Sequence, residues 1–267
     1  MRFILLLTIL FVQRVSAQNE LATWICGYQL GFVSNVIDTG EHKNFGANII
    51  DFRGPNLKIT RKFRTLTMND CNLSMCDSSG NLLFFSNGAK IFNSKDSLIE
   101  GADSLSPSRI WEYNHIERDF DYYGTTFYGY STPNGSIFAL PKGKNTNQYY
   151  IFNFYMNTDS LGTRFEYIFS SFNYSILDMN QNQGRGKVVL KEKSLIKGEF
   201  SRCVTACRKA NGKDWWLIMQ DNKTQYAHIL TVSEDTIIYE KKYKLHRIDE
   251  YTSSGFSNDG KYYALTG

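Results

Sequence analysis

Short apolar runs alternate with clusters of turn-forming residues along almost the whole chain. The clearest runs are Leu82–Phe85, Ile137–Leu140, Tyr149–Phe154, Trp215–Met219 and Tyr262–Leu265, and each follows a segment rich in Asn, Asp, Ser and Gly. Asn-Gly and Asp-Gly steps accept the positive φ of tight hairpin turns. Continuous apolar runs between such turns are typical of strands buried on both faces. The pattern therefore predicts an all-β chain of hairpins whose sheets stack face to face.

The spacing of the turn glycines indicates a repeated unit. Gly80, Gly135, Gly212 and Gly260 are separated by 55, 77 and 48 residues. The longest interval is roughly twice the ~40–45 residues of a four-stranded propeller blade. Repeated hairpins and only 4 prolines favour a β-propeller of four-stranded antiparallel blades over a β-sandwich. Residues 18–267 would then form one propeller domain of about five to six blades.

Residues 1–17 have the features of a secretory signal peptide. Arg2 precedes an apolar stretch over residues 3–12, and Val15-Ser16-Ala17 provides a small-x-small cleavage site. This stretch is shorter than the ~18 residues that a membrane span requires, and no later stretch approaches that length. We therefore expect an exported protein, secreted or held at the cell surface, with no membrane span.

Charge and composition narrow the class of partner. The formal net charge is +4, of which Arg2 and Arg14 supply two, so the exported chain would carry +2. This balance argues against a nucleic-acid-binding protein, which usually presents a concentrated basic face. Aromatic residues make up 15% of the chain, and their flat side chains pack well on pleated sheets.

Five cysteines in an exported chain raise the question of disulfides. They are Cys26, Cys71, Cys76, Cys203 and Cys207. If Cys71 and Cys76 lie along one strand, they are about 16 Å apart, whereas a disulfide needs Cα atoms within about 7 Å. Neither the Cys71/Cys76 pair nor the Cys203/Cys207 pair has the C-x-x-C spacing of a zinc site. Buried thiols are the favoured interpretation, one cross-strand disulfide stays open, and no metal or other cofactor is expected.

One segment interrupts the rhythm of runs and turns. Residues 101–132 are rich in aromatic and charged residues but poor in turn residues. We expect an irregular insertion that covers the end of a blade. As a ligand-contacting loop it would use Trp111, Tyr113, Tyr122 and Tyr123 as its binding residues, because long loops often carry function.

Several hairpins resemble those of known propellers. Residues 256–264, FSNDGKYYA, are similar to the FSPDGKxxA hairpin of TolB-like and Trp-Asp-repeat propellers, with Asn258 in place of the usual proline. Residues 24–27 (WICG) and 74–88 (SMCDSSGNLLFFSNG) resemble the W-x-F-G start and SISDxxGNLLFYTDG hairpin of an exported Bacteroidetes propeller family. Residues 147–152 (NQYYIF) and 205–218 (TACRKANGKDWWLI) extend the resemblance over most of 24–267, with the insertion at 101–132 as a departure.

The resemblance implies a setting and a larger architecture. Members of that family usually head longer surface proteins of the gliding-motility and type IX secretion system, with adhesion-type modules and a C-terminal sorting domain. Gly267 directly follows an apolar run. We therefore expect the propeller to be truncated at its C-terminus, with further C-terminal domains missing from this chain.

Catalytic motifs are weak. There is no G-x-S-x-G nucleophile elbow, and the four histidines are scattered singly. Carboxylate pairs that could serve a glycosidase are Asp119 with Asp121, Glu234 with Asp235, and Asp249 with Glu250. We expect a non-catalytic recognition, adhesion or scaffold module for an extracellular protein or polysaccharide. The alternative is a carbohydrate-active enzyme or lectin with carboxylates at the central channel, where two of them within ~10 Å would favour the enzyme.

Overall fold

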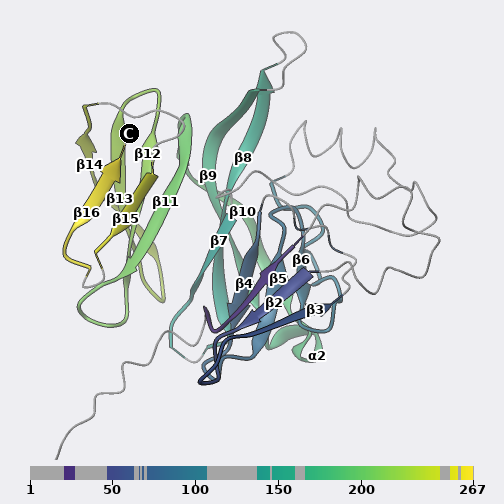
Figure 1. The fold of residues 1–267 in the computed structure, drawn as a ribbon. Coiled ribbons are helices and arrows are strands. Elements are labelled where there is room, and N and C mark those ends of the chain that lie inside the picture. Colours follow the sequence, from purple (N-terminus) through teal and green to yellow (C-terminus); the bar gives the residue numbers. More distant parts are fainter. Residues whose placement is uncertain are drawn as a thin grey trace, which may run out of the picture.

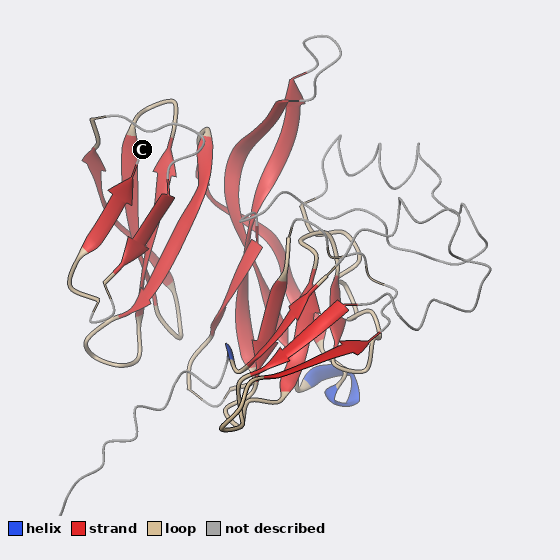
Figure 2. Cartoon of the chain, viewed as in Figure 1, coloured by secondary structure: helices blue, strands red, loops and turns tan. Residues whose placement is uncertain are grey.

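The computed structural model consists almost entirely of β-strands (Figures 1 and 2). It describes residues 21–27, 47–62, 66, 68, 71–106, 137–144, 146–159, 166–246, 253–257 and 260–266. The all-β prediction is confirmed for these residues. Within them, no helix is long and apolar enough to cross a membrane.

The described strands form five antiparallel sheets, none of them closed, and in each sheet the neighbours follow chain order. Sheet 1 contains β1 (Thr23–Cys26), β2 (Ala47–Asp51) and β3 (Lys58–Lys62), and sheet 2 contains β4 (Leu73–Cys76), β5 (Leu82–Ser86) and β6 (Ile91–Asn93). Sheet 3 contains β7 (Ile137–Pro141), β8 (Gln148–Asp159), β9 (Glu166–Asp178) and β10 (Lys187–Lys197), with the one-turn helix α2 (Gln181–Gly184) between β9 and β10. Sheet 4 contains β11 (Phe200–Arg208), β12 (Trp215–Asp221), β13 (Tyr226–Val232) and β14 (Ile237–Lys244), and sheet 5 contains β15 (Ser253–Phe256) and β16 (Tyr263–Thr266).

Three of the four predicted turn glycines occupy the expected conformation. Gly80, Gly212 and Gly260 have φ values of 82°, 69° and 68°. Each lies between the first and second strands of its sheet, so the repeat found in the sequence marks the first hairpin of sheets 2, 4 and 5. In sheet 3 this place is taken by Gly143, at φ 79°, whereas Gly135 lies outside the described residues.

The interval between Gly135 and Gly212 does not hold two sheets, as the spacing suggested. It holds sheet 3 alone, followed by β11. Strands β8, β9 and β10 contain 12, 13 and 11 residues, about twice the usual strand length. The long strands, rather than a second unit, account for the extra residues.

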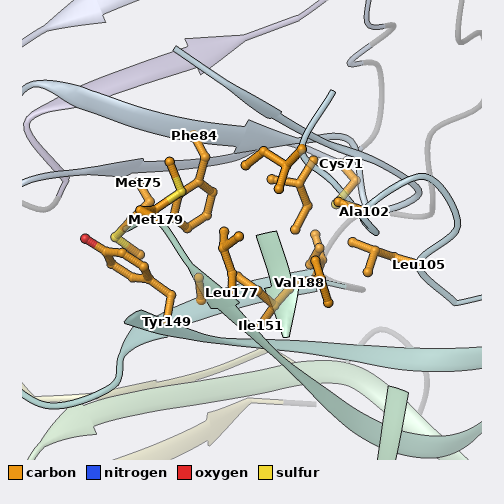
Figure 3. Close-up of a cluster of buried hydrophobic side chains, with 14 residues drawn as sticks. Cys71, Met75, Phe84, Ala102, Leu105, Tyr149, Ile151, Leu177, Met179 and Val188 are labelled. Atoms are coloured by element: carbon orange, nitrogen blue, oxygen red, sulfur yellow. The ribbon is translucent and has the colours of Figure 1, made fainter. Parts of the chain in front are cut away.

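The inner sheets are packed on both faces, because alternate residues of a strand point to opposite sides. On β8, Tyr149 and Ile151 belong to the cluster shared with sheet 2, whereas Tyr150 and Phe152 belong to the cluster shared with sheet 4. Figure 3 shows the first of these clusters, in which Phe84 of β5 faces Tyr149 across the interface, with ring centroids 5.1 Å apart. The predicted face-to-face stacking of sheets is therefore present.

In three of the four steps from one described sheet to the next, the first strands lie next to one another. β1 lies beside β4, β4 beside β7, and β11 beside β15. Sheets 3 and 4 meet through β9 and β11 and through an apolar cluster that includes Phe172 and Phe200. The sheets are thus placed in chain order, each against the next.

The tandem tryptophans of β12 point to opposite faces of sheet 4. Trp215 is 8% exposed, packs in the cluster shared with sheet 3, and lies under the Arg208 guanidinium, 4.5 Å from its ring. Trp216 is only half-buried, and the Lys209 ammonium lies 3.5 Å from its ring centroid. The two rings therefore differ: Trp215 is buried between sheets 3 and 4, whereas Trp216 lies partly in solvent.

Candidate functional site

The four residues predicted to bind ligand, Trp111, Tyr113, Tyr122 and Tyr123, lie outside the described residues. The structure does describe the beginning of the predicted insertion, residues 101–106. Ala102 and Leu105 are fully buried in the core between sheets 2 and 3 (Figure 3). Backbone hydrogen bonds from Ile91 N to Ala102 O (3.1 Å) and from Leu105 N to Ala89 O (2.9 Å) tie this segment to sheet 2.

A buried polar cluster holds the last described residue of this segment, Ser106. Its backbone N–H donates to Glu192 Oε1 at 3.2 Å, and its hydroxyl donates to the carbonyl oxygen of Phe154. Ser106 is 2% exposed and has a φ of 54°. Positive φ is uncommon for a residue other than glycine, so the surrounding contacts fix this conformation.

Glu192 lies at the centre of the cluster, in an irregular stretch of β10 between Leu190 and Lys193. Its own φ is 53°, and its N–H donates to the Ser175 hydroxyl at 3.0 Å. Its carboxylate accepts from Asn153 Nδ2 at 3.1 and 3.0 Å and from Asn173 Nδ2 at 3.4 Å. The β-bulge thus turns a carboxylate onto neighbouring strands, which is a common use of bulges.

Asn153 leaves one acceptor unused. It is 1% exposed, and its Oδ1 has no hydrogen-bond partner among the residues that the structure describes. An unpaired buried carbonyl oxygen costs about 1–3 kcal/mol. The cluster can therefore accept one more donor, such as a hydroxyl, close to Ser106.

This cluster was not predicted from the sequence, although one feature of the sequence pointed to a buried polar contact. Asn153 is the one polar residue within the apolar run 149–154, and a buried polar side chain requires a partner. Its partner Glu192 is 39 residues away and is aimed by a bulge. Neither fact can be derived from the strand pattern.

The carboxylate pairs considered for catalysis do not converge where they are described. Glu234 and Asp235 are exposed in the turn between β13 and β14. The Glu234 carbonyl oxygen accepts a hydrogen bond from the Tyr150 hydroxyl at 3.2 Å, and burial raises the pKa of Tyr150 to about 12. This contact joins sheets 3 and 4 and is structural. The other two pairs, Asp119 with Asp121 and Asp249 with Glu250, lie outside the described residues.

His228 is a buried titratable group of sheet 4 and lies beside the buried Asp221. It is 8% exposed; its Nδ1 lies 3.0 Å from the Tyr239 hydroxyl and its Nε2 lies 3.8 Å from Asp221 Oδ2. Burial lowers the pKa of His228, Lys242 adds to this effect, and Asp221 opposes it. The imidazole is therefore held neutral, and no group of three or more His, Cys, Asp or Glu suited to a metal ion occurs in the described part of the chain.

Four of the five cysteines are described, and none of these four forms a disulfide. Cys71 and Cys76 are buried, as predicted, whereas Cys26 and Cys207 are half-buried. Burial raises the pKa of the Cys76 thiol, which donates to the Thr23 carbonyl oxygen at 3.6 Å. A raised pKa makes a poor nucleophile at neutral pH.

Comparison with known proteins gives no assignment: no family model matches the chain, and no curated protein matches it. The class that the structure itself defines is an all-β protein of successive antiparallel sheets.

Proposed function

We propose that the chain is an exported, non-catalytic β-propeller that serves as a recognition, adhesion or scaffold module for an extracellular protein or polysaccharide. The observation that carries this proposal is the contact between first strands in three of the four steps between sheets, β1 with β4, β4 with β7, and β11 with β15, whereas sheets 3 and 4 meet through β9 and β11. In a propeller the first strand of each blade lies nearest the axis, so first strands of successive blades are neighbours. A two-layer sandwich does not produce this series of contacts.

The composition of these first strands supports a role without catalysis. In β1, β4, β7, β11 and β15 the side chains are apolar, hydroxyl-bearing, sulfur-containing or basic, and none is Asp or Glu. Typical glycosidases need two carboxyl groups about 5–9.5 Å apart. Strands that would face the axis of this propeller do not supply them.

The binding function is proposed for the insertion at 101–132. The described beginning of this segment is anchored by the core and by the Glu192 cluster, so its departure point is fixed. Loops placed on a rigid scaffold are frequent binding elements, and tyrosine and tryptophan offer large contact areas. The residues proposed for contact are Trp111, Tyr113, Tyr122 and Tyr123.

The test combines a binding screen with an activity screen. The exported chain is applied to glycan and extracellular-protein arrays and to chromogenic glycosides. The double variant Trp111→Ala/Tyr113→Ala is expected to lose at least tenfold in affinity for any ligand found. Tyr262→Ala, which removes an aromatic side chain that is 73% exposed just before β16, is the matched control and should bind normally. Glycoside turnover that is abolished by one carboxylate substitution would overturn the non-catalytic assignment.

A further inference from the structure

Strand β14 lies at the edge of sheet 4 (Figure 1). It carries an unusual set of exposed basic and aromatic side chains. Lys241, Lys242, Tyr243 and Lys244 are all exposed, and Tyr226 of the neighbouring strand β13 is half-buried beside them. We call these five residues the β14 edge. Because β14 pairs only with β13, the side chains of both its faces reach solvent along one border of the sheet.

Tyrosine rings hold the three ammonium groups in place. The Lys242 and Lys244 Nζ atoms lie 4.4 and 4.8 Å from the centroid of the Tyr226 ring, and Lys241 Nζ lies 5.0 Å from that of Tyr243. Lys244 Nζ also donates to the carbonyl oxygen of Thr224 at 2.8 Å. Cation–π contacts order long lysine side chains that would otherwise be mobile, which lowers the entropy lost on binding an anion.

These positive charges form no ion pairs within the described chain. None of the three ammonium groups forms an ion pair with a described carboxylate. Glu240, the acidic residue of β14, accepts from the Thr231 hydroxyl and lies 4.0 Å from Lys209 Nζ. The contact with Tyr243 and, to a smaller extent, the charge of Glu240 raise the pKa of Lys241. Two like charges therefore converge on the single ring of Tyr226, an arrangement that an anion would stabilise.

We propose that the β14 edge binds an acidic polysaccharide, one that carries carboxylate or sulfate groups along its length. A linear polyanion fits this surface because the ammonium groups follow a strand instead of surrounding one pocket. Short lysine-rich stretches are known to bind anionic polymers, and the near-neutral exported chain lacks the broad basic face of a nucleic-acid-binding protein. The inference rests on the extracellular location in the proposed function, but it uses a surface separate from the 101–132 insertion.

Lysines on an edge strand also have a simpler use, which is to prevent pairing with strands of other molecules. Strand β3, the edge of sheet 1, allows the two roles to be separated. It is exposed along its whole length and carries three basic residues, Lys58, Arg61 and Lys62, but Lys62 pairs with Asp96 at 2.8 Å. It is the matched control because the same number of charges can be removed there.

The experiment measures binding of the exported chain to alginate, to dextran sulfate and to neutral dextran at low and high salt. The variant Lys241→Gln/Lys242→Gln/Lys244→Gln is expected to lose at least tenfold in affinity for both acidic polymers. The control Lys58→Gln/Arg61→Gln/Lys62→Gln should lose less than threefold. Wild-type binding should weaken with salt, since exposed charges are screened, and neutral dextran should not bind.

Hydrogen exchange on the wild-type chain gives a second readout that needs no variant. Bound alginate should slow exchange in β13 and β14 and leave β3 unchanged. The proposal is overturned if wild-type protein binds neither acidic polymer, if both triple variants lose affinity equally, or if protection appears in β3 as strongly as in β14. Binding that is lost in Trp111→Ala/Tyr113→Ala but kept in the β14 variant would overturn this inference and leave the proposed function standing.

Discussion

The stacking of sheets predicts that the two tryptophans Trp215 and Trp24 contribute very differently to stability. Trp215 is 8% exposed between sheets 3 and 4, whereas Trp24 is 46% exposed on the outer face of sheet 1. Trp24 touches Phe52 edge-on, with ring centroids 5.1 Å apart. Replacement of each by alanine compares a residue between two sheets with one that has a sheet on one side only.

The magnitude follows from buried area. A large aromatic side chain buries ~150–250 Å², and at ~25 cal/mol per Å² its transfer out of water is worth about 4–6 kcal/mol. Alanine retains little of this area, and partial collapse of the cavity recovers some of the loss. We therefore expect Trp215→Ala to lower the free energy of unfolding by about 3–5 kcal/mol, and Trp24→Ala by about 1–2 kcal/mol.

Urea unfolding followed by far-UV circular dichroism measures both losses, and it does not depend on tryptophan fluorescence. The milder variant Trp215→Phe, with an expected loss of about 1–2 kcal/mol, serves if Trp215→Ala does not fold. A loss below ~1 kcal/mol for Trp215→Ala, or equal losses for the two tryptophans, would refute the packing of sheet 4 on sheet 3.

Two further predictions concern the polar groups. Glu192→Ala leaves the donors of two asparagine amides and one backbone N–H unpaired, so urea unfolding should show a loss of about 2–3 kcal/mol. The exposed Glu234→Ala should stay within about 0.5 kcal/mol, and a Glu192→Ala loss as small as that would contradict the cluster. Burial lowers the pKa of His228, so the unfolded chain takes up a proton first as pH falls. Stability should therefore drop as pH falls from the ordinary histidine pKa of about 6.5 to the lowered folded value. His228→Gln should show a smaller drop over that range in melts measured by circular dichroism, and an unchanged drop would contradict the assignment.

Turn chemistry and hydrophobic pattern were enough to predict the all-β class and several hairpins. Gly80, Gly212 and Gly260 have positive φ where the sequence placed tight turns, because few other residues accept that conformation. Strand length was not predictable: β8 continues to Asp159, past the end of the apolar run 149–154, and β9 is of similar length. Their extra residues are ordered by pairing with each other, and that pairing leaves no mark in the local sequence.

The candidate site was harder to predict, because its members are brought together by conformations that their residue types do not favour. Glu192 and Ser106 both have positive φ, which a sequence analysis assigns to Gly, Asn or Asp. Only the polar Asn153 inside an apolar run pointed to a buried partner. Which residue that partner is depends on the register between β8, β9 and β10 and on the bulge in β10.

When a strand has apolar residues on both faces, the sequence shows that both faces can be buried. It does not show which neighbouring sheets, if any, cover them. The rule holds for β8, which has sheets on both sides. In sheet 1 the same pattern has another outcome: Ile25 is buried against sheet 2, while Trp24, one residue before it, faces solvent. In register with Trp24 is Ile59 of β3, which is 59% exposed, so a whole row of apolar side chains crosses this outer face. Stacking order, which no local pattern encodes, thus decides whether an alternate apolar residue stabilises the fold or stays in water.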